Sequence, residues 1–263
     1  MLRLIVLLCS MLVLPATAQQ PLRIAIIIDD LGNSLHLGRE AVELPGALMY
    51  SVLPKLPYSR EIARRAYDSG KEVMLHLPMQ THDGRFLGPG GLHRALSRKE
   101  FARAVRASLA AVPHVSGVNN HMGSLLTRDK ASMRWLMQDL SCFYGLYFVD
   151  SRTDVRTVAR ELAREAGLAN AQRDVFLDNQ QDPDYVRSQF RRLIAKAQEE
   201  GTAIGIGHPY PATLAVLAEE LPRLADQGIQ LVPVSKLVET QRNPNLWHAS
   251  SSPLQTVAKN SKR

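Results

Sequence analysis

The sequence predicts an α/β protein whose strands form an irregular (β/α) barrel of seven or eight units. Apolar, strand-like runs alternate with segments of helical periodicity along most of the 263 residues, and this alternation favours a parallel sheet with right-handed crossovers. Seven or eight such units fit a barrel, and an open doubly wound sheet is the alternative. No glycine-rich phosphate loop follows the first strand, so nucleotide binding is excluded.

The first eighteen residues have the composition of a secretory signal peptide. Arg3 gives a short basic start, residues 4–14 are apolar, and Ala16-Thr17-Ala18 is a small-x-small cleavage site. The apolar run is short for a membrane span, and a retained N-terminal anchor is the alternative. The sequence therefore predicts cleavage after Ala18, export to the periplasm or a similar compartment, and no stable membrane span after cleavage.

Cysteine content and charge restrict the class of protein further. Cleavage would leave Cys142 as the single cysteine, so the mature chain has no internal disulfide and depends on a large core. The formal net charge is +7, but the basic residues are scattered over predicted helices. This pattern favours a generally solvated surface, with affinity for anionic envelope polymers as the alternative. No nucleic-acid-binding motif is present.

The first predicted strand organises the rest of the chain. Its apolar run, residues 24–28, stops at two adjacent carboxylates, Asp29 and Asp30, which indicates a strand buried on both faces. Two acids there are costly to desolvate unless a metal ion, a proton relay or a substrate compensates them. Alternatively, one caps the next helix and the other is solvated. Gly32 and Asn33 are expected to break the strand, so that both acids reach one site.

Further strands and helices follow in alternation. Strands are expected at residues 47–53, 71–77, 115–118, 146–149, 175–177, 203–206 and 229–232. Helices are expected after Ser34, over residues 58–69, from the capping box at Ser97, from Thr127, from Thr153 or Asp154 to Ala166, from Asp182 to Gly201 and over residues 213–224. Residues 79–96 form a loop and residues 243–263 a polar, disordered tail, so the folded domain is expected to span residues 19–242.

Acidic and imidazole side chains recur at the predicted strand ends. In strand order they are Asp29 and Asp30, His76, His121, Asp150 and His208. In a parallel barrel all carboxyl ends of strands meet at one rim. Each residue alone is more often structural, but their convergence favours a site of one carboxylate and two imidazoles. Such a ligand set suits zinc or another first-row divalent ion.

Several phrases of the sequence together resemble the divergent branch of the polysaccharide deacetylase superfamily. They are IAIIIDDLGNS, VMLHLPMQ, GVNNHMGS, FVDSRT and AIGIGHPYPATL, and they lie between Leu22 and Val238. The resemblance implies a deacetylase-like irregular barrel. It also implies metal-dependent removal of acyl groups, such as acetyl, from amino sugars of a polysaccharide or peptidoglycan-like glycan.

The resemblance also assigns roles to individual residues. Asp29 corresponds to the catalytic base and Asp30 to a metal ligand. The family's His-x-x-x-His pair matches only at His76, because its second position is Gln80. His121 is then the expected second imidazole, and a divalent metal, with zinc preferred, is the expected cofactor.

The remaining roles concern proton donation and substrate binding. His208 matches the family's late histidine, a general acid or transition-state stabiliser. Asn119 and Asn120 lie where the family carries an Arg-Pro-Tyr-like segment and are expected to donate hydrogen bonds to substrate. Asp150 and Arg152 complete the expected substrate-binding set, in which Asp150 is expected to orient a neighbouring histidine or Arg152. Two alternatives stay open: a catalytically degenerate glycan-binding or scaffolding protein of the cell envelope, and a metal-dependent hydrolase of another substrate.

Overall fold

The computed structural model describes residues 22–242, with side chains up to Val238. Within this part, nine parallel strands form one curled sheet in the order β6-β5-β4-β3-β2-β1-β8-β7, and β9 pairs with β1. The strands are β1 (Leu22–Leu31), β2 (Met49–Val52), β3 (Glu72–Met79), β4 (Val115–Met122), β5 (Tyr147–Asp150), β6 (Ala169–Gln172), β7 (Val175–Phe176), β8 (Thr202–Gly207) and β9 (Ile229–Leu231).

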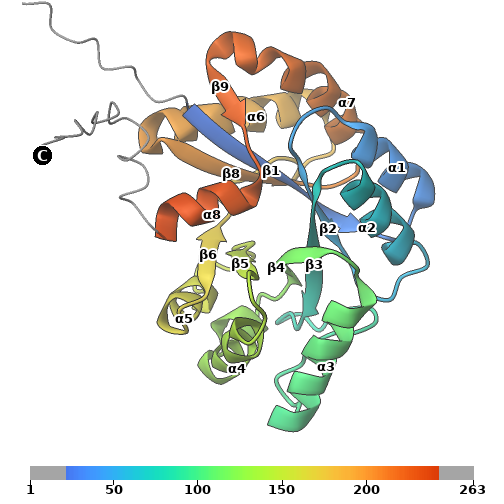
Figure 1. Ribbon diagram of the computed structural model, residues 1–263, viewed down its shortest axis with the longest axis vertical. Coiled ribbons are helices and arrows are strands. Elements are labelled where there is room, and N and C mark those ends of the chain that lie inside the picture. The colour runs from blue at the N-terminus through green and yellow to red at the C-terminus, as the bar shows by residue number, and fades with distance from the viewer. Residues whose placement is uncertain (1–21, 243–263) are drawn as a thin grey trace, which may run out of the picture.

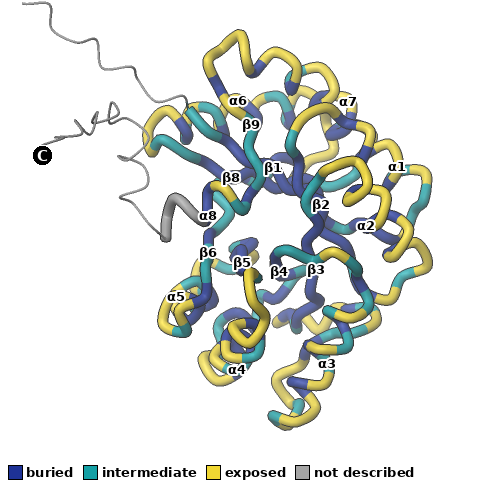
Figure 2. Tube along the Cα trace, viewed as in Figure 1, coloured by how far each residue is buried: buried dark blue, intermediate teal, exposed yellow. Residues whose placement is uncertain are grey.

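Helices surround the curled sheet, and their outward faces are exposed (Figures 1 and 2). They are α1 (Leu35–Glu43), α2 (Ser59–Asp68), α3 (Arg98–Ala111), α4 (Lys130–Ser141), α5 (Ala159–Glu165), α6 (Pro183–Glu200), α7 (Pro211–Glu220) and α8 (Val234–Arg242), with 3-10 turns at Leu126–Arg128, Leu221–Arg223 and Ala225–Gln227. The predicted caps at Ser34, Ser97 and Asp182 are confirmed, because each side chain accepts a backbone N–H of the first helical turn.

Alternate residues of each strand contribute to two apolar layers. Ile24, Ile26 and Ile28 of β1 belong to the large cluster between sheet and helices. Ala25 and Ile27 belong to a second cluster inside the curl. The inner cluster continues through the other strands and α8, with Met49, Met74, Tyr147, Val149, Ala171, Ile204, Ile206, Val234, Leu237 and Val238. Helix α8 packs against the amino end of the curl, where Ser235 bonds Glu72 at the start of β3.

A single chain segment spans the two edges of the sheet. Strand β6 pairs with β5, whereas β7, two residues later, pairs with β8. Between them Arg173 donates its N–H to Asp150, and Asp174 donates its N–H to Ile204, both at 2.9 Å. The prediction of an irregular (β/α) barrel is therefore confirmed as a curled parallel half-barrel, and the open doubly wound alternative is not.

Two strands extend further than the sequence predicts. Pro78 was expected to end β3, yet β3 runs to Met79 and pairs there with β4. The pairing of β3 with β2 ends at Leu75, so Pro78, which has no N–H, loses no hydrogen bond to β2. Strand β4 likewise runs to Met122 rather than ending at Val118. The consequence is that His121, like His76, lies within a paired strand and not in the loop that follows it.

Other boundaries differ for local reasons. Strand β6 and helix α8 were not predicted. Thr127 does not cap α4, because its hydroxyl donates to Gly123 and Asp129 is the cap. Helix α5 starts at Ala159, since the Asp154 side chain closes a turn onto the N–H of Arg156 instead of capping a helix.

Several sequence predictions fall partly or wholly outside the structural description. The leader, its cleavage site and the tail after residue 242 lie beyond the described residues. Within the described part, Cys142 is a free, exposed thiol. No helix in residues 22–242 combines the length and apolarity needed to cross a membrane.

Candidate metal centre

The inward side chains change from apolar to polar at the carboxyl ends of the strands. In β1, Asp29 follows the inward residues Ala25 and Ile27 at alternate positions. The same period of two places His76 after Met74 in β3. Register pairing then sets His76 beside Asn119, and Pro78 beside His121. A polar layer therefore lies above the apolar filling of the half-barrel.

Asp30 reaches the same layer because the backbone turns at that residue. On a regular strand Asp29 and Asp30 would face opposite sides of the sheet. Asp30 adopts φ 59°, a left-handed conformation that is uncommon outside glycine, and the pairing of β1 with β2 shifts register between Ile28 and Leu31. The predicted break exists, but it is centred on Asp30 itself and not on Gly32 and Asn33. A strained backbone at a polar strand end is typical of functional sites.

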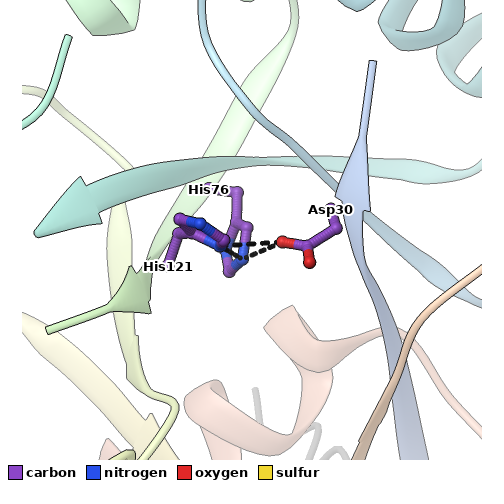
Figure 3. A group of neighbouring side chains, drawn as sticks. All are labelled: Asp30, His76 and His121. Atoms are coloured by element: carbon purple, nitrogen blue, oxygen red, sulfur yellow. Dashed lines mark hydrogen bonds and ion pairs between the residues drawn. The ribbon is translucent and has the colours of Figure 1, made fainter. Parts of the chain in front are cut away.

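Asp30, His76 and His121 place three potential ligand atoms within reach of one ion (Figure 3). Oδ1 of Asp30 lies 2.8 Å from Nδ1 of His121 and 3.1 Å from Nε2 of His76. The two ring nitrogens are 3.2 Å apart. Donors around a tetrahedral zinc with bonds of about 2.0–2.1 Å are about 3.3 Å apart, so the observed triangle is close to that size.

The chemistry of the three atoms also fits a cation. Oδ1 of Asp30 is buried and forms no hydrogen bond of acceptable geometry with any described residue. A buried acceptor without such a bond needs an explanation, and a bound cation is one of the recognised ones. Two imidazole nitrogens pointing at each other also require a proton or a metal between them. The trio can therefore hold a divalent metal, as the sequence predicted.

Asn119 connects the candidate metal ligands to Asp29. Its Oδ1 lies 2.7 Å from Nδ1 of His76 and accepts the hydroxyl of Ser51 at 2.6 Å. Its Nδ2 donates to Oδ1 of Asp29 at 2.9 Å. Because the Asn119 oxygen only accepts, it holds the proton on Nδ1 of His76 and leaves the Nε2 lone pair for a metal. Asn119 is fully buried.

His208 lies on the other side of Asp30 and is held by Asp178. Its Nε2 is 3.7 Å from Oδ2 of Asp30, and its Nδ1 is 2.9 Å from Oδ1 of Asp178. The other Asp178 oxygen accepts the N–H of His208 and the hydroxyl of Thr213. Sequence reasoning gave Asp178 no role, although it follows a predicted strand just as Asp150 does.

The charges of the site favour a cation at its centre. Burial raises the pKa of Asp30, but the nearby His121 and His76 outweigh it and the net pKa is lowered. Burial lowers the pKa of His76, but the charges of Asp29 and Asp30 prevail and the net pKa is raised. Burial also lowers the pKa of His208, yet the hydrogen bond and charge of Asp178, followed by the charges of Asp30 and Asp29, raise it to about 9.

Three of the predicted substrate-binding residues make internal contacts. Asn119, Asn120 and Asp150 are completely or almost completely buried. Asn120 bonds the N–H of Ser151 and the carbonyl of Met122, so it fastens the loop after β5. Asp150 accepts the N–H of Arg152 and the hydroxyl of Thr157, so of its two predicted partners it holds the backbone of Arg152 and not a histidine. The structure shows positioning contacts here, and contact with a substrate stays untested.

Gln80 has a structural environment that explains why it is not a ligand. Its side-chain oxygen accepts the N–H of Arg94, and its backbone carbonyl accepts the N–H groups of Leu125 and Leu126. Gln80 therefore ties the long β3–α3 loop to the turn after β4. His121, from the neighbouring strand, supplies the imidazole that the His-x-x-x-His pattern lacks at this position.

The sequence matches the divergent polysaccharide deacetylase family over residues 26–238. The chain belongs to this family. It is 39% identical over 216 residues to the uncharacterized protein YibQ of Escherichia coli K12. The aligned region covers 82% of this chain and 67% of YibQ.

Solved structures share the fold. The uncharacterized protein ATU2773 of Agrobacterium tumefaciens superposes with a TM-score of 0.80 at 22% identity, covering 85% of this chain and 92% of that protein. The peptidoglycan deacetylase PdaC of Bacillus subtilis superposes with a TM-score of 0.53 at 19% identity, covering 88% of this chain and 98% of that protein. At these identities the likeness shows a deacetylase-like fold.

Proposed function

We propose that this protein is an exported, metal-dependent hydrolase that removes acetyl or similar acyl groups from amino sugars of a cell-envelope glycan. The observation that carries the proposal is the grouping of Asp30, His76 and His121 beside a second carboxylate, Asp29, and a second imidazole, His208. A metal site flanked by a general base and a general acid is a set of groups that can catalyse amide hydrolysis. Membership of the divergent polysaccharide deacetylase family supports a glycan as the substrate.

Asp29 is placed to accept a proton. Its Oδ1 is engaged by the amide of Asn119, and its Oδ2 lies 3.6 Å from Nε2 of His76. Asp30, His76 and His121 would hold a divalent metal, which would supply polarisation of the acyl carbonyl and a lowered pKa of water. In the proposed reaction Asp29 takes one proton from the attacking water, and the oxygen of that water bonds the carbonyl carbon.

His208 is placed to supply a proton. With a pKa of about 9 its imidazole is mostly protonated at neutral pH, and Asp178 fixes its ring through Nδ1. The Nε2–H therefore points toward Asp30 and the reaction centre. When the carbon–nitrogen bond of the amide breaks, His208 protonates the leaving amine, and the products are a carboxylic acid and a free amino sugar.

Two substitutions separate metal binding from proton transfer. Asp29→Asn is expected to keep the metal and lose about 100- to 10,000-fold in acetate release, because an amide cannot accept the proton. Asp30→Asn is expected to lose metal and turnover together. Metal content by mass spectrometry and acetate release from N-acetylated glycan fragments are measured for the parent and both variants. His82→Ala is the matched control, since His82 is exposed and lies outside the trio.

The outcomes distinguish the proposal from its alternatives. Full turnover in Asp29→Asn with metal retained would remove Asp29 from the mechanism. Glycan binding by the parent without any acetate release would favour the scaffolding alternative. Acetate release from a non-sugar acyl amide but not from glycans would favour a hydrolase of another class.

A further inference from the structure

A second set of polar residues lies at the carboxyl ends of β5 and β6, in the same polar layer as the metal-binding trio. Arg173 continues the ladder of β6, because its N–H donates to the carbonyl of Asp150. It follows Ala169 and Ala171 at alternate positions, and Ala171 belongs to the inner cluster with Ala169 packed against it. The period of two therefore turns Arg173 toward the inside of the half-barrel, in the layer that holds the other polar residues.

The guanidinium of Arg173 is fixed in that position. Its Nε donates to the carbonyl of Ser151 at 2.7 Å and its Nη2 to the carbonyl of Arg152 at 3.0 Å. The group lies over the ring of Phe176, 5.0 Å from the ring centre. The ring of Phe176 is in turn 5.2 Å from that of His208. Arg173 is thus linked by direct contacts to the imidazole beside the trio.

Arg152 adds a second positive charge at the same place. Arg152 and Arg173 are both half-buried, and neither forms an ion pair with any residue of the described chain. Burial, followed by the charge of Arg152, lowers the pKa of Arg173, and the more weakly acting charges of Asp150, Asp174 and Asp29 only partly oppose this fall. Two like charges held together with no carboxylate at ion-pair distance in the described chain are costly. The backbone of Arg152 is also strained, with φ 49°, and Asp150 enforces this by accepting its N–H.

Ser151, which precedes Arg152 in the chain and accepts a hydrogen bond from Arg173 through its carbonyl, has an unused hydroxyl. Its side chain is almost fully buried, and Oγ has no hydrogen-bond partner among the described residues. Its backbone N–H is bonded to Asn120, the residue before His121. A buried hydroxyl without a partner, beside two guanidinium groups that form no ion pair in the described chain, is a donor set that an oxyanion would satisfy.

We propose that Arg152, Arg173 and Ser151 form a subsite for an anionic group, a carboxylate or a phosphate, carried by the sugar substrate. The proposal rests on the proposed function, because the subsite would select among acylated glycans. Arginine suits this task, since its planar fork can bind both oxygens of such a group. A glycan that carries a carboxylate or phosphate near the acylated amine is therefore preferred to a neutral one.

Binding of matched glycans to the metal-loaded chain tests the subsite. Calorimetry would use three probes: an oligosaccharide of alternating N-acetylglucosamine and N-acetylmuramic acid, the same oligosaccharide with its carboxyl groups reduced to alcohols, and an N-acetylglucosamine oligosaccharide bearing a 6-phosphate. The parent is expected to bind at least one anionic probe about tenfold or more tightly than the reduced probe. The two anionic probes distinguish a carboxylate from a phosphate ligand.

Variants assign the preference to the arginines. Arg152→Gln is expected to lose about tenfold in affinity for the preferred anionic probe and less than twofold for the reduced probe, and Arg152→Lys to lose less. Arg156→Gln is the matched control, because Arg156 is an exposed arginine of the same loop, paired with Asp154. The preference is expected to persist after chelation of the metal, which excludes coordination of the probe's anion by the ion.

Separate outcomes bear on the subsite and on the proposed function. Equal binding of charged and reduced probes, or equal losses in Arg152→Gln and Arg156→Gln, would overturn the subsite even if acetate is released. Charge-dependent binding lost in Arg152→Gln, without acetate release from any probe, would keep the subsite and overturn the hydrolase.

Discussion

Replacing Asn119 with alanine removes one amide that serves three buried groups. Oδ1 of Asp29, Nδ1 of His76 and Oγ of Ser51 lose partners at 2.9, 2.7 and 2.6 Å. An unsatisfied buried group costs about 1–3 kcal/mol, and three of them at the low end give a loss of about 3 kcal/mol in the free energy of unfolding. Removing the acceptor behind a ligating imidazole typically lowers metal affinity about 10- to 100-fold.

The matched control is Ser51→Ala, which removes a single hydroxyl from the same amide and leaves the contacts to Asp29 and His76. It is expected to cost about 1 kcal/mol of stability and to change zinc affinity less than threefold. Zinc affinity is measured by competition with a chromophoric chelator, and stability by urea unfolding of the metal-free chains. Unchanged zinc affinity in a folded Asn119→Ala protein would refute the positioning role of Asn119.

Three further predictions follow from the site and the leader. Asp178→Asn removes the negative charge that raises the pKa of His208. Because His208 must be protonated to act, the decrease of kcat/KM at alkaline pH should then occur at lower pH. An alkaline decrease at the same pH as in the parent would contradict the role of His208 as the acid. Metal affinity should weaken as pH falls, because the raised pKa of His76 lets protons compete for Nε2; titration of metal content against pH checks this. Exported protein should begin near Gln19, and N-terminal sequencing that finds Met1 would exclude cleavage.

The fold and the identity of the clustered side chains could be predicted because they depend on local periodicity. Alternating apolar runs and caps such as Ser97 are encoded in short stretches of sequence, and parallel strands bring their carboxyl ends together. Asp30, His76 and His121 were expected to meet on these grounds and on family resemblance, and the structure brings them together.

The partners of those side chains could not be predicted, because they depend on register and on single backbone angles. Asn119 faces His76 only because β3 and β4 pair in one register. Asp30 faces the same site as Asp29 because Asp30 itself is in the left-handed conformation. The sequence favoured a break two residues later, at Gly32. The role of Asp178 appears only once β7 lies beside β8.

The location of a bound metal tests the central claim most directly. Crystals of the mature chain grown with zinc would be measured at the zinc absorption edge, and the anomalous difference map would locate the ion. The account predicts one peak per chain within bonding distance of Oδ1 of Asp30, Nε2 of His76 and Nδ1 of His121. A peak held by other residues, or none at these three atoms in crystals that contain one zinc per chain, would contradict it.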